Sequence, residues 1–149
     1  MDTKSPSWVT SGRQSGMGRG TTASIRPGHA EHDLVRFPPH YRSHPSGIEC
    51  IEVTRLLCYD TGNATKYVWR RGDKGNPAQD LEKSLFYLAD ARNNVPECRY
   101  APQRAVELLY RVAAAEPDPD AAKFYTAVAE MQWDAAEDAV RKLRAAFPV

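Results

Sequence analysis

The sequence predicts an all-α protein with one compact core and an N-terminal tail. Apolar residues recur at helical spacing through residues 37–149, and no run alternates between apolar and polar residues as a half-buried strand does. We expect a core of short helices over residues 37–95, followed by a helical hairpin within residues 96–149 that can serve assembly. Residues 1–36 are rich in Ser, Gly, Thr and Arg, and they bury too little apolar surface to offset the entropy of ordering, so we expect a disordered tail.

The first two predicted helices lie on either side of an expected break at residues 60–62. The first helix covers residues 48–59, and its apolar residues occupy most of its circumference, which indicates burial on several sides. The Asp-Thr-Gly sequence at the break interrupts this pattern. The second helix is then expected over residues 63–71, with Gly72 as its C-terminal cap.

The third predicted helix has the clearest start signal in the chain. Asn76 can accept hydrogen bonds from first-turn amides, Pro77 suits the first helical position, and Gln79 can complete a capping box. An apolar stripe then continues for three turns and ends near Asn93. Pro96 marks the stop, so this helix is expected to end just before it.

Start signals also divide the C-terminal region into helices. Pro102 opens a fourth helix, and Asp118 followed by Pro119 repeats the cap-then-proline pattern ahead of a fifth. Asp134 and Glu137 resemble a capping box for a last helix, although one long bent helix is also compatible with the sequence.

Composition restricts the function classes and the compartment. Twenty basic and nineteen acidic side chains give a formal charge of +1, which does not favour nucleic-acid binding by bulk electrostatics. Cys50, Cys58 and Cys98 are odd in number and lack CxxC spacing, so we expect free, buried thiols. No run approaches the roughly 20 apolar residues of a membrane span, and no apolar run typical of a signal peptide is present. We therefore expect a cytoplasmic protein without a membrane partner.

The second predicted helix carries an uncommon polar stripe. Asn63, Lys66, Tyr67 and Arg70 fall at i, i+3, i+4 and i+7 and therefore share one face. Lys66 and Arg70 are placed to hold a phosphate, while Tyr67 or Trp69 can stack on a base. The alternative is an ordinary solvated basic face.

Acidic residues in the first and third predicted helices are candidate metal ligands or bases. Glu49 and Glu52 are three residues apart on one face, where two carboxylates can hold Mg²⁺ or one can act as a base. In the third helix, Asp80, Lys83 and Tyr87 share a face that is distinct from the leucine stripe. The simpler reading is an amphipathic helix edge for the glutamates and a favourable helix dipole for Asp80.

Several segments together resemble a known family. They are His40-Tyr41, the GIECIE of residues 47–52, the GNATKYVWR of residues 62–70, and the DLEK and FYL of residues 80–88. This combination resembles the SaV-like phage family catalogued as domain of unknown function 3310, which includes a coliphage nucleotide kinase. The resemblance covers about a third of the chain, and Phe86 stands where the family usually has Trp.

The resemblance implies a phage-encoded protein that acts on deoxynucleotides in the host cytoplasm and forms homo-oligomers. We expect a nucleoside monophosphate kinase without a P-loop, which transfers the γ-phosphoryl group of ATP with the help of Mg²⁺. The residues assigned to catalysis are Lys66, Arg70 and Glu49. Those assigned to substrate binding are His40, Tyr41, Glu52, Asn63, Tyr67, Trp69, Asp80, Lys83 and Tyr87, and those assigned to Mg²⁺ are Glu49, Glu52 and Asp80.

Two other function classes remain open on the sequence. The carboxylates of the first helix, with Asp80 and Asp90, also suit an all-α, Mg²⁺-dependent nucleotide pyrophosphohydrolase. A protein that binds a nucleotide or a host factor without turnover is the third class, with the C-terminal helices as its interface.

Overall fold

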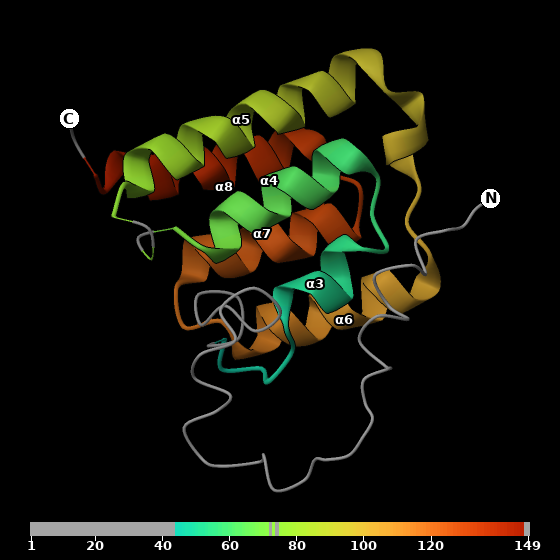
Figure 1. The fold of residues 1–149 in the computed structure, drawn as a ribbon, viewed down its shortest axis with the longest axis horizontal. Helices are drawn as coiled ribbons and strands as arrows, with labels where there is room; N and C mark the ends of the chain where they lie inside the picture. Colours follow the sequence, from blue (N-terminus) through green and yellow to red (C-terminus); the bar gives the residue numbers. More distant parts are fainter. Residues whose placement is uncertain (1–43, 72, 74, 148–149) are drawn as a thin grey trace, which may run out of the picture. The chain divides into compact units, whose positions relative to one another are not determined.

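Six α-helices and one 3-10 helix form the part of the chain that the computed structural model describes, residues 44–71, 73 and 75–147 (Figure 1). Within these residues there is no strand, so the predicted all-α class is confirmed. None of these helices is long and apolar enough to cross a membrane. The elements are α3 (Cys50–Thr54), α4 (Tyr59–Trp69), α5 (Pro77–Asn94), η3 (Pro96–Arg99), α6 (Gln103–Ala115), α7 (Pro119–Ala129) and α8 (Trp133–Ala145).

The helices form two layers of three. Figure 1 shows α3, α4 and α5 in front of α6, α7 and α8, and contacts join α3 to α6, α4 to α7 and α5 to α8. Neighbours along the chain also pack together, most extensively α4 with α5 and α7 with α8. The core lies between the layers, and its largest fully buried side chains include Leu81, Leu88, Leu109, Phe124 and Tyr125. Because α8 packs on α5, this core is shared across the expected boundary at residue 95.

The break between the first two helices lies earlier than expected. Helix α3 ends at Thr54, and α4 begins at Tyr59, so the expected break at residues 60–62 is wrong and those residues form the first turn of α4. The cause is Cys58, which caps α4 by accepting a hydrogen bond from the Thr61 amide on its sulfur at 3.5 Å. Gly62 fits there because α4 passes close to α3: a Cβ at this position would lie 3.3 Å from the Thr54 carbonyl oxygen. The expected cap Gly72 lies outside the described residues.

The start signals of α5 and α7 are confirmed. Asn76 caps α5 by accepting a hydrogen bond from the Gln79 amide at 3.0 Å, with Pro77 at the first helical position. Asp118 caps α7 in the same way, accepting from the Asp120 amide at 2.9 Å. In both caps the side chain and the amide are close in sequence, so the caps could be predicted from the sequence.

The last two helices are separate. Helix α7 ends at Ala129, and Met131, two residues before the start of α8, adopts a left-handed conformation with φ of 58° that breaks the helix. The alternative of one long bent helix is therefore wrong. The expected capping box of Asp134 and Glu137 is also wrong, because Gln132 is the N-cap. The Glu137 side chain is instead buried, and Arg92 of α5 lies 2.8 Å from its carboxylate.

The cysteines depart from expectation in one respect. Cys58 and Cys98 form a disulfide that joins the start of α4 to η3, with their Cα atoms 5.4 Å apart. The expectation of free thiols is wrong for these two residues and correct for Cys50, which is buried in the core. The disulfide could not be predicted from the sequence, because the two cysteines are 40 residues apart and only the packing of η3 against α4 brings them together.

Candidate functional site

The ring of Tyr67 lies at the centre of three cationic side chains. From α4, Lys66 Nζ lies 4.7 Å and Arg70 Cζ 4.8 Å from the ring centroid. From α5, Lys83 Nζ lies 5.4 Å from the same centroid. These distances are within cation–π range, so the electron-rich face of Tyr67 attracts positive charge from both helices.

Tyr87 completes this group, which we call the Tyr67 cluster: Lys66, Tyr67, Arg70, Lys83 and Tyr87. The rings of Tyr67 and Tyr87 stack, with centroids 6.0 Å apart and planes 9° from parallel. All five residues were candidates on sequence, and the pairing of α4 with α5 brings them together. The cluster combines three cationic groups, of a kind that can hold phosphate, with stacked aromatic rings.

The aromatic surface extends beyond the cluster toward the start of α4. Tyr59 and Phe86 both meet Tyr87 edge to face, with ring centroids 5.9 Å and 5.2 Å from it. Tyr59 is 75% exposed and Phe86 65% exposed. A hydrogen bond with Tyr59 raises the pKa of the Tyr87 hydroxyl. Two rings that contact Tyr87 are thus largely exposed.

Asp80 and Arg70 form an ion pair at the edge of the cluster. Arg70 Nη2 donates to Asp80 Oδ1 at 3.1 Å, and Asp80 is only 2% exposed. The carboxylate therefore fixes the direction of the guanidinium. This role differs from the expected one, in which Asp80 held Mg²⁺.

The two expected metal ligands on the first helix are used at its N-terminus. Glu52 Oε2 accepts a hydrogen bond from the Glu49 amide at 2.8 Å, as part of a capping box at the start of α3. Among the described residues, no group of three or more His, Cys, Asp or Glu side chains is arranged to hold a metal ion. The structure thus does not assemble Glu49, Glu52 and Asp80 as a ligand set.

The remaining sequence candidates lie elsewhere. Trp69 is buried, and its ring packs against His44 and Tyr125 with centroids 5.0 Å and 5.7 Å away, so the structure places it in the core. Asn63 lies on the α4 stripe, but its side-chain amide donates to the Tyr59 carbonyl oxygen of the preceding turn at 3.0 Å. The candidates His40 and Tyr41 lie outside the described residues.

Sequence reasoning missed an acid pair beside the aromatic surface. Asp60, in the first turn of α4, is 5% exposed and shares a hydrogen bond with Asp90 of α5. Burial and this contact raise the pKa of Asp60 to about 6. Hydrogen bonds from Asn94, at 2.7 Å, and from Asp60 lower the pKa of Asp90. The pair was missed because Asp60 was taken for a helix breaker, and no local signal links it to Asp90.

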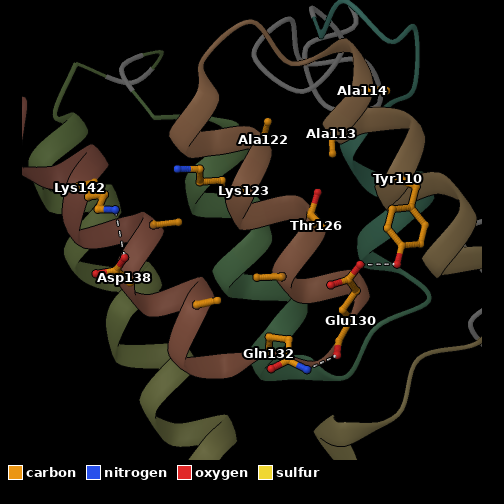
Figure 2. A pocket seen from close by; sticks show the side chains of 13 residues that line it. Tyr110, Ala113, Ala114, Ala122, Lys123, Thr126, Glu130, Gln132, Asp138 and Lys142 are labelled. Atoms are coloured by element: carbon orange, nitrogen blue, oxygen red, sulfur yellow. Dashed lines mark hydrogen bonds and ion pairs between the residues drawn. The ribbon is translucent and has the colours of Figure 1, made fainter.

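A separate cavity opens between α6, α7 and α8, with a volume of about 600 Å³ (Figure 2). Polar side chains that line the cavity pair with one another: Lys142 forms an ion pair with Asp138 at 3.3 Å, and the Tyr110 hydroxyl donates to Glu130 at 2.8 Å. Lys123 projects from α7, between the lining residues of α6 and those of α8 (Figure 2). None of the sequence candidates lines this cavity, whose other lining residues are Ala113, Ala114, Ala122, Thr126, Ala127, Gln132, Ala135 and Ala139.

One family model matches the chain over the segment that holds the Tyr67 cluster. Residues 35–89 match the family described as protein of unknown function (DUF3310). This match supports membership of the DUF3310 family. The DUF3310 segment covers a little over a third of the chain and ends within α5, before the three helices of the second layer. Searches of curated proteins and of solved structures each found no match.

Proposed function

We propose that the Tyr67 cluster binds a deoxynucleotide and that the protein transfers the γ-phosphoryl group of ATP to a deoxynucleoside monophosphate. The observation that supports this proposal is the convergence of Lys66, Arg70 and Lys83, from two helices, on one aromatic ring. Phosphoryl transfer depends mainly on positioning and on neutralising charge, and both are tasks for such cations.

The three cations have different tasks in this proposal. Arg70 is oriented by Asp80, so its guanidinium can present a fixed fork to a phosphate. Lys66 and Lys83 are flexible point charges that can leave the Tyr67 face to meet phosphate oxygens. The base would then lie against the rings of Tyr87 and Tyr59, and Trp69 has no part because it is buried in the core.

Mg²⁺ is not assigned to protein ligands in this proposal. Glu49 and Glu52 are engaged at the start of α3, and Asp80 is engaged with Arg70. Mg²⁺ would therefore arrive on the phosphates of ATP.

The resemblance to the SaV-like phage family gives the proposal a wider setting. We propose a phage-encoded protein that acts in the host cytoplasm and assembles as a homo-oligomer, as the family resemblance implies. Size-exclusion chromatography with light scattering tests the assembly. A monomer at micromolar concentration would contradict it.

A pyrophosphohydrolase is the second candidate, and one observation favours it. Asp90, which the sequence had already suggested for such an enzyme, is joined next to the aromatic surface by a second carboxylate, Asp60. Such an enzyme would release pyrophosphate from a deoxynucleoside triphosphate. An assay of the reaction products, described next, separates the kinase from the pyrophosphohydrolase.

The deciding experiment incubates the protein with Mg-ATP and each deoxynucleoside monophosphate, and separately with each deoxynucleoside triphosphate. A new diphosphate with matching ADP supports the kinase, and a monophosphate with pyrophosphate supports the hydrolase. The absence of both products contradicts both enzyme proposals and favours a protein that binds without turnover.

Matched lysine variants locate the site. Lys66→Ala and Lys83→Ala should weaken nucleotide binding by about 10- to 150-fold, because a charged hydrogen bond contributes about 1.5–3 kcal/mol. Lys123→Ala, in the cavity between α6, α7 and α8, is the control and should bind as the parent does. Weaker binding by Lys123→Ala alone would place the site in that cavity and refute the Tyr67 cluster.

A further inference from the structure

The Cys58–Cys98 disulfide closes the hairpin that carries the Tyr67 cluster. Cys58 immediately precedes α4, and Cys98 lies in η3 immediately after α5. The loop between the two sulfurs therefore contains the whole of α4 and α5. Its two ends are the open ends of the helical hairpin, next to the acid pair and the exposed tyrosine ring of Tyr59.

Cys58 also determines where the first turn of α4 sits. Its sulfur accepts a hydrogen bond from the Thr61 amide and lies 3.1 Å from the Thr61 hydroxyl. The next two residues, Tyr59 and Asp60, are those that reach across to Tyr87 and Asp90 of α5. A covalent bond to Cys58 therefore also restrains the part of α4 that contacts α5 at the aromatic surface.

The opposite end of α4 is held independently of the disulfide. Arg71, just beyond the helix, donates to Glu116 at 3.4 Å and to the Val68 carbonyl oxygen at 2.7 Å. Trp69 is buried beside it. Loss of the disulfide would therefore release one end of α4 and leave the other in place.

We propose that the Cys58–Cys98 disulfide is a redox switch that holds the first turn of α4 in its binding position, and that a dithiol reductant releases this turn and weakens nucleotide binding. The binding half of this inference rests on the proposed function. The proposed function places the protein in the cytoplasm, where disulfides that do form are usually transient or redox-sensing, and this favours a regulatory role for the bond.

The chemistry of release is thiol–disulfide exchange. A thiolate of the reductant attacks the sulfur of Cys58, which is partly exposed, and Cys98, which is buried, leaves as a thiolate that takes up a proton. The second thiol of the reductant then displaces Cys58 from the mixed disulfide. The protein gains two electrons and two protons, and the dithiol becomes a cyclic disulfide.

The two carboxyl groups at this end of the hairpin favour its opening once the tether is cut. Asp60 and Asp90 face each other, and at neutral pH both tend to ionise, so their charges repel. The disulfide opposes this repulsion by fixing the start of α4 to η3. Its removal should therefore loosen the first turn beyond the usual fraying of a helix end.

Hydrogen exchange tests the conformational half without any nucleotide. Amides of the first turn and the following residues of α4, such as Asn63, should exchange about tenfold faster in protein reduced by dithiothreitol than in oxidised protein. Amides of α8 are the internal reference and should not change. Equal exchange in α4 before and after reduction would overturn the switch.

A serine variant separates the tether from the cap. Cys58→Ser cannot form the disulfide, but a serine hydroxyl is a good N-cap and can still accept from the Thr61 amide. This variant should match reduced parent protein in α4 exchange, with or without dithiothreitol. If it matches oxidised protein instead, the disulfide does not hold the first turn.

Binding of ATP and of the four standard deoxynucleoside monophosphates tests the regulatory half. Reduction should weaken the affinity of the nucleotide that binds by about tenfold, and reoxidation should restore it. Faster exchange with unchanged affinity would overturn control of the site. Faster exchange with no binding in either state would refute the proposed function and with it the regulatory half, while supporting a conformational role for the disulfide.

Discussion

Glu116 links three parts of the chain, and its replacement gives the sharpest test of the structure. It follows α6, and its carboxylate is nearly buried, with 5% of the side chain exposed. It accepts hydrogen bonds from His44 Nε2 at 3.0 Å, from the Asp118 amide at 3.0 Å and from Arg71 Nη2 at 3.4 Å. Because the Ser46 amide donates to His44 Nδ1, the proton of a neutral His44 ring must be on Nε2.

The expected cost of Glu116→Gln follows from these partners. A glutamine keeps one acceptor oxygen, and its NH₂ group must face either His44 or both the Asp118 amide and Arg71, all of which are donors. At least one donor then loses its partner, and the remaining hydrogen bonds lose the negative charge of their acceptor. We expect a loss of about 2–3 kcal/mol in the free energy of unfolding.

Urea denaturation measures this loss. With a slope of about 2 kcal/mol per molar urea, the unfolding midpoint should fall by roughly 1–1.5 M. A double-mutant cycle with His44→Ala should give a coupling energy of at least about 1 kcal/mol, because the two residues share a hydrogen bond. A loss below about 0.5 kcal/mol, or additive variants, would refute the network and the placement of His44.

The network also has a defined pH dependence. Burial alone would raise the pKa of Glu116, but hydrogen bonds from His44 and Asp118 and the charge of Arg71 together lower it. A group with a lowered folded pKa contributes stability above its unfolded pKa, near 4.3, and loses it as pH falls further. The difference between parent and Glu116→Gln should therefore be full at pH 7 and shrink in acid.

Three further predictions concern α4 and α5. Asp60→Asn should stabilise the protein at pH 7 and lose this advantage toward pH 4. Burial and Asp90 raise the pKa of Asp60 to about 6, so the folded parent protein takes up a proton on Asp60 as the pH falls from 7 to 4 and becomes more stable. Equal differences in urea midpoint between variant and parent at both pH values would contradict this prediction. Asn76→Ala should cost about 1 kcal/mol in urea denaturation through loss of the α5 cap, and an unchanged midpoint would exclude the cap. Ser84→Ala should cost about 1 kcal/mol, because its buried hydroxyl donates to the Ala64 carbonyl oxygen at 3.0 Å, and a gain in stability would show that this bond is absent.

Local signals in the sequence predicted the fold where both partners of an interaction are close in the chain. The caps at Asn76 and Asp118 act on amides two or three residues away, so residue type and spacing were sufficient. The cap at Cys58 was missed because sulfur is not among the usual capping groups. Glu137 was misread because its partner Arg92 is 45 residues away in sequence.

The candidate site was predictable to the extent that it depends on helical periodicity. The stripe of Lys66, Tyr67 and Arg70 follows from spacing alone, and α5 adds its own residues to the same cluster. Periodicity also argues against Trp69, because residues two apart on a helix point roughly 200° from each other. The Asp60–Asp90 pair depends on how α4 and α5 align, which the sequence did not specify.

The way in which α4 is held decides which variants can identify the site. Its ends are fixed by the disulfide and by Arg71 with Glu116, and the half-buried Tyr67 cluster lies between these two anchors. Within this cluster, removal of Arg70 strips the buried Asp80 carboxylate of a guanidinium partner and destabilises the fold. Weak binding by Arg70→Ala would therefore not distinguish a lost phosphate contact from a disturbed helix. Lys66→Ala and Lys83→Ala remove charge from the same ring without leaving a buried charge behind, so binding by these two variants is the decisive evidence.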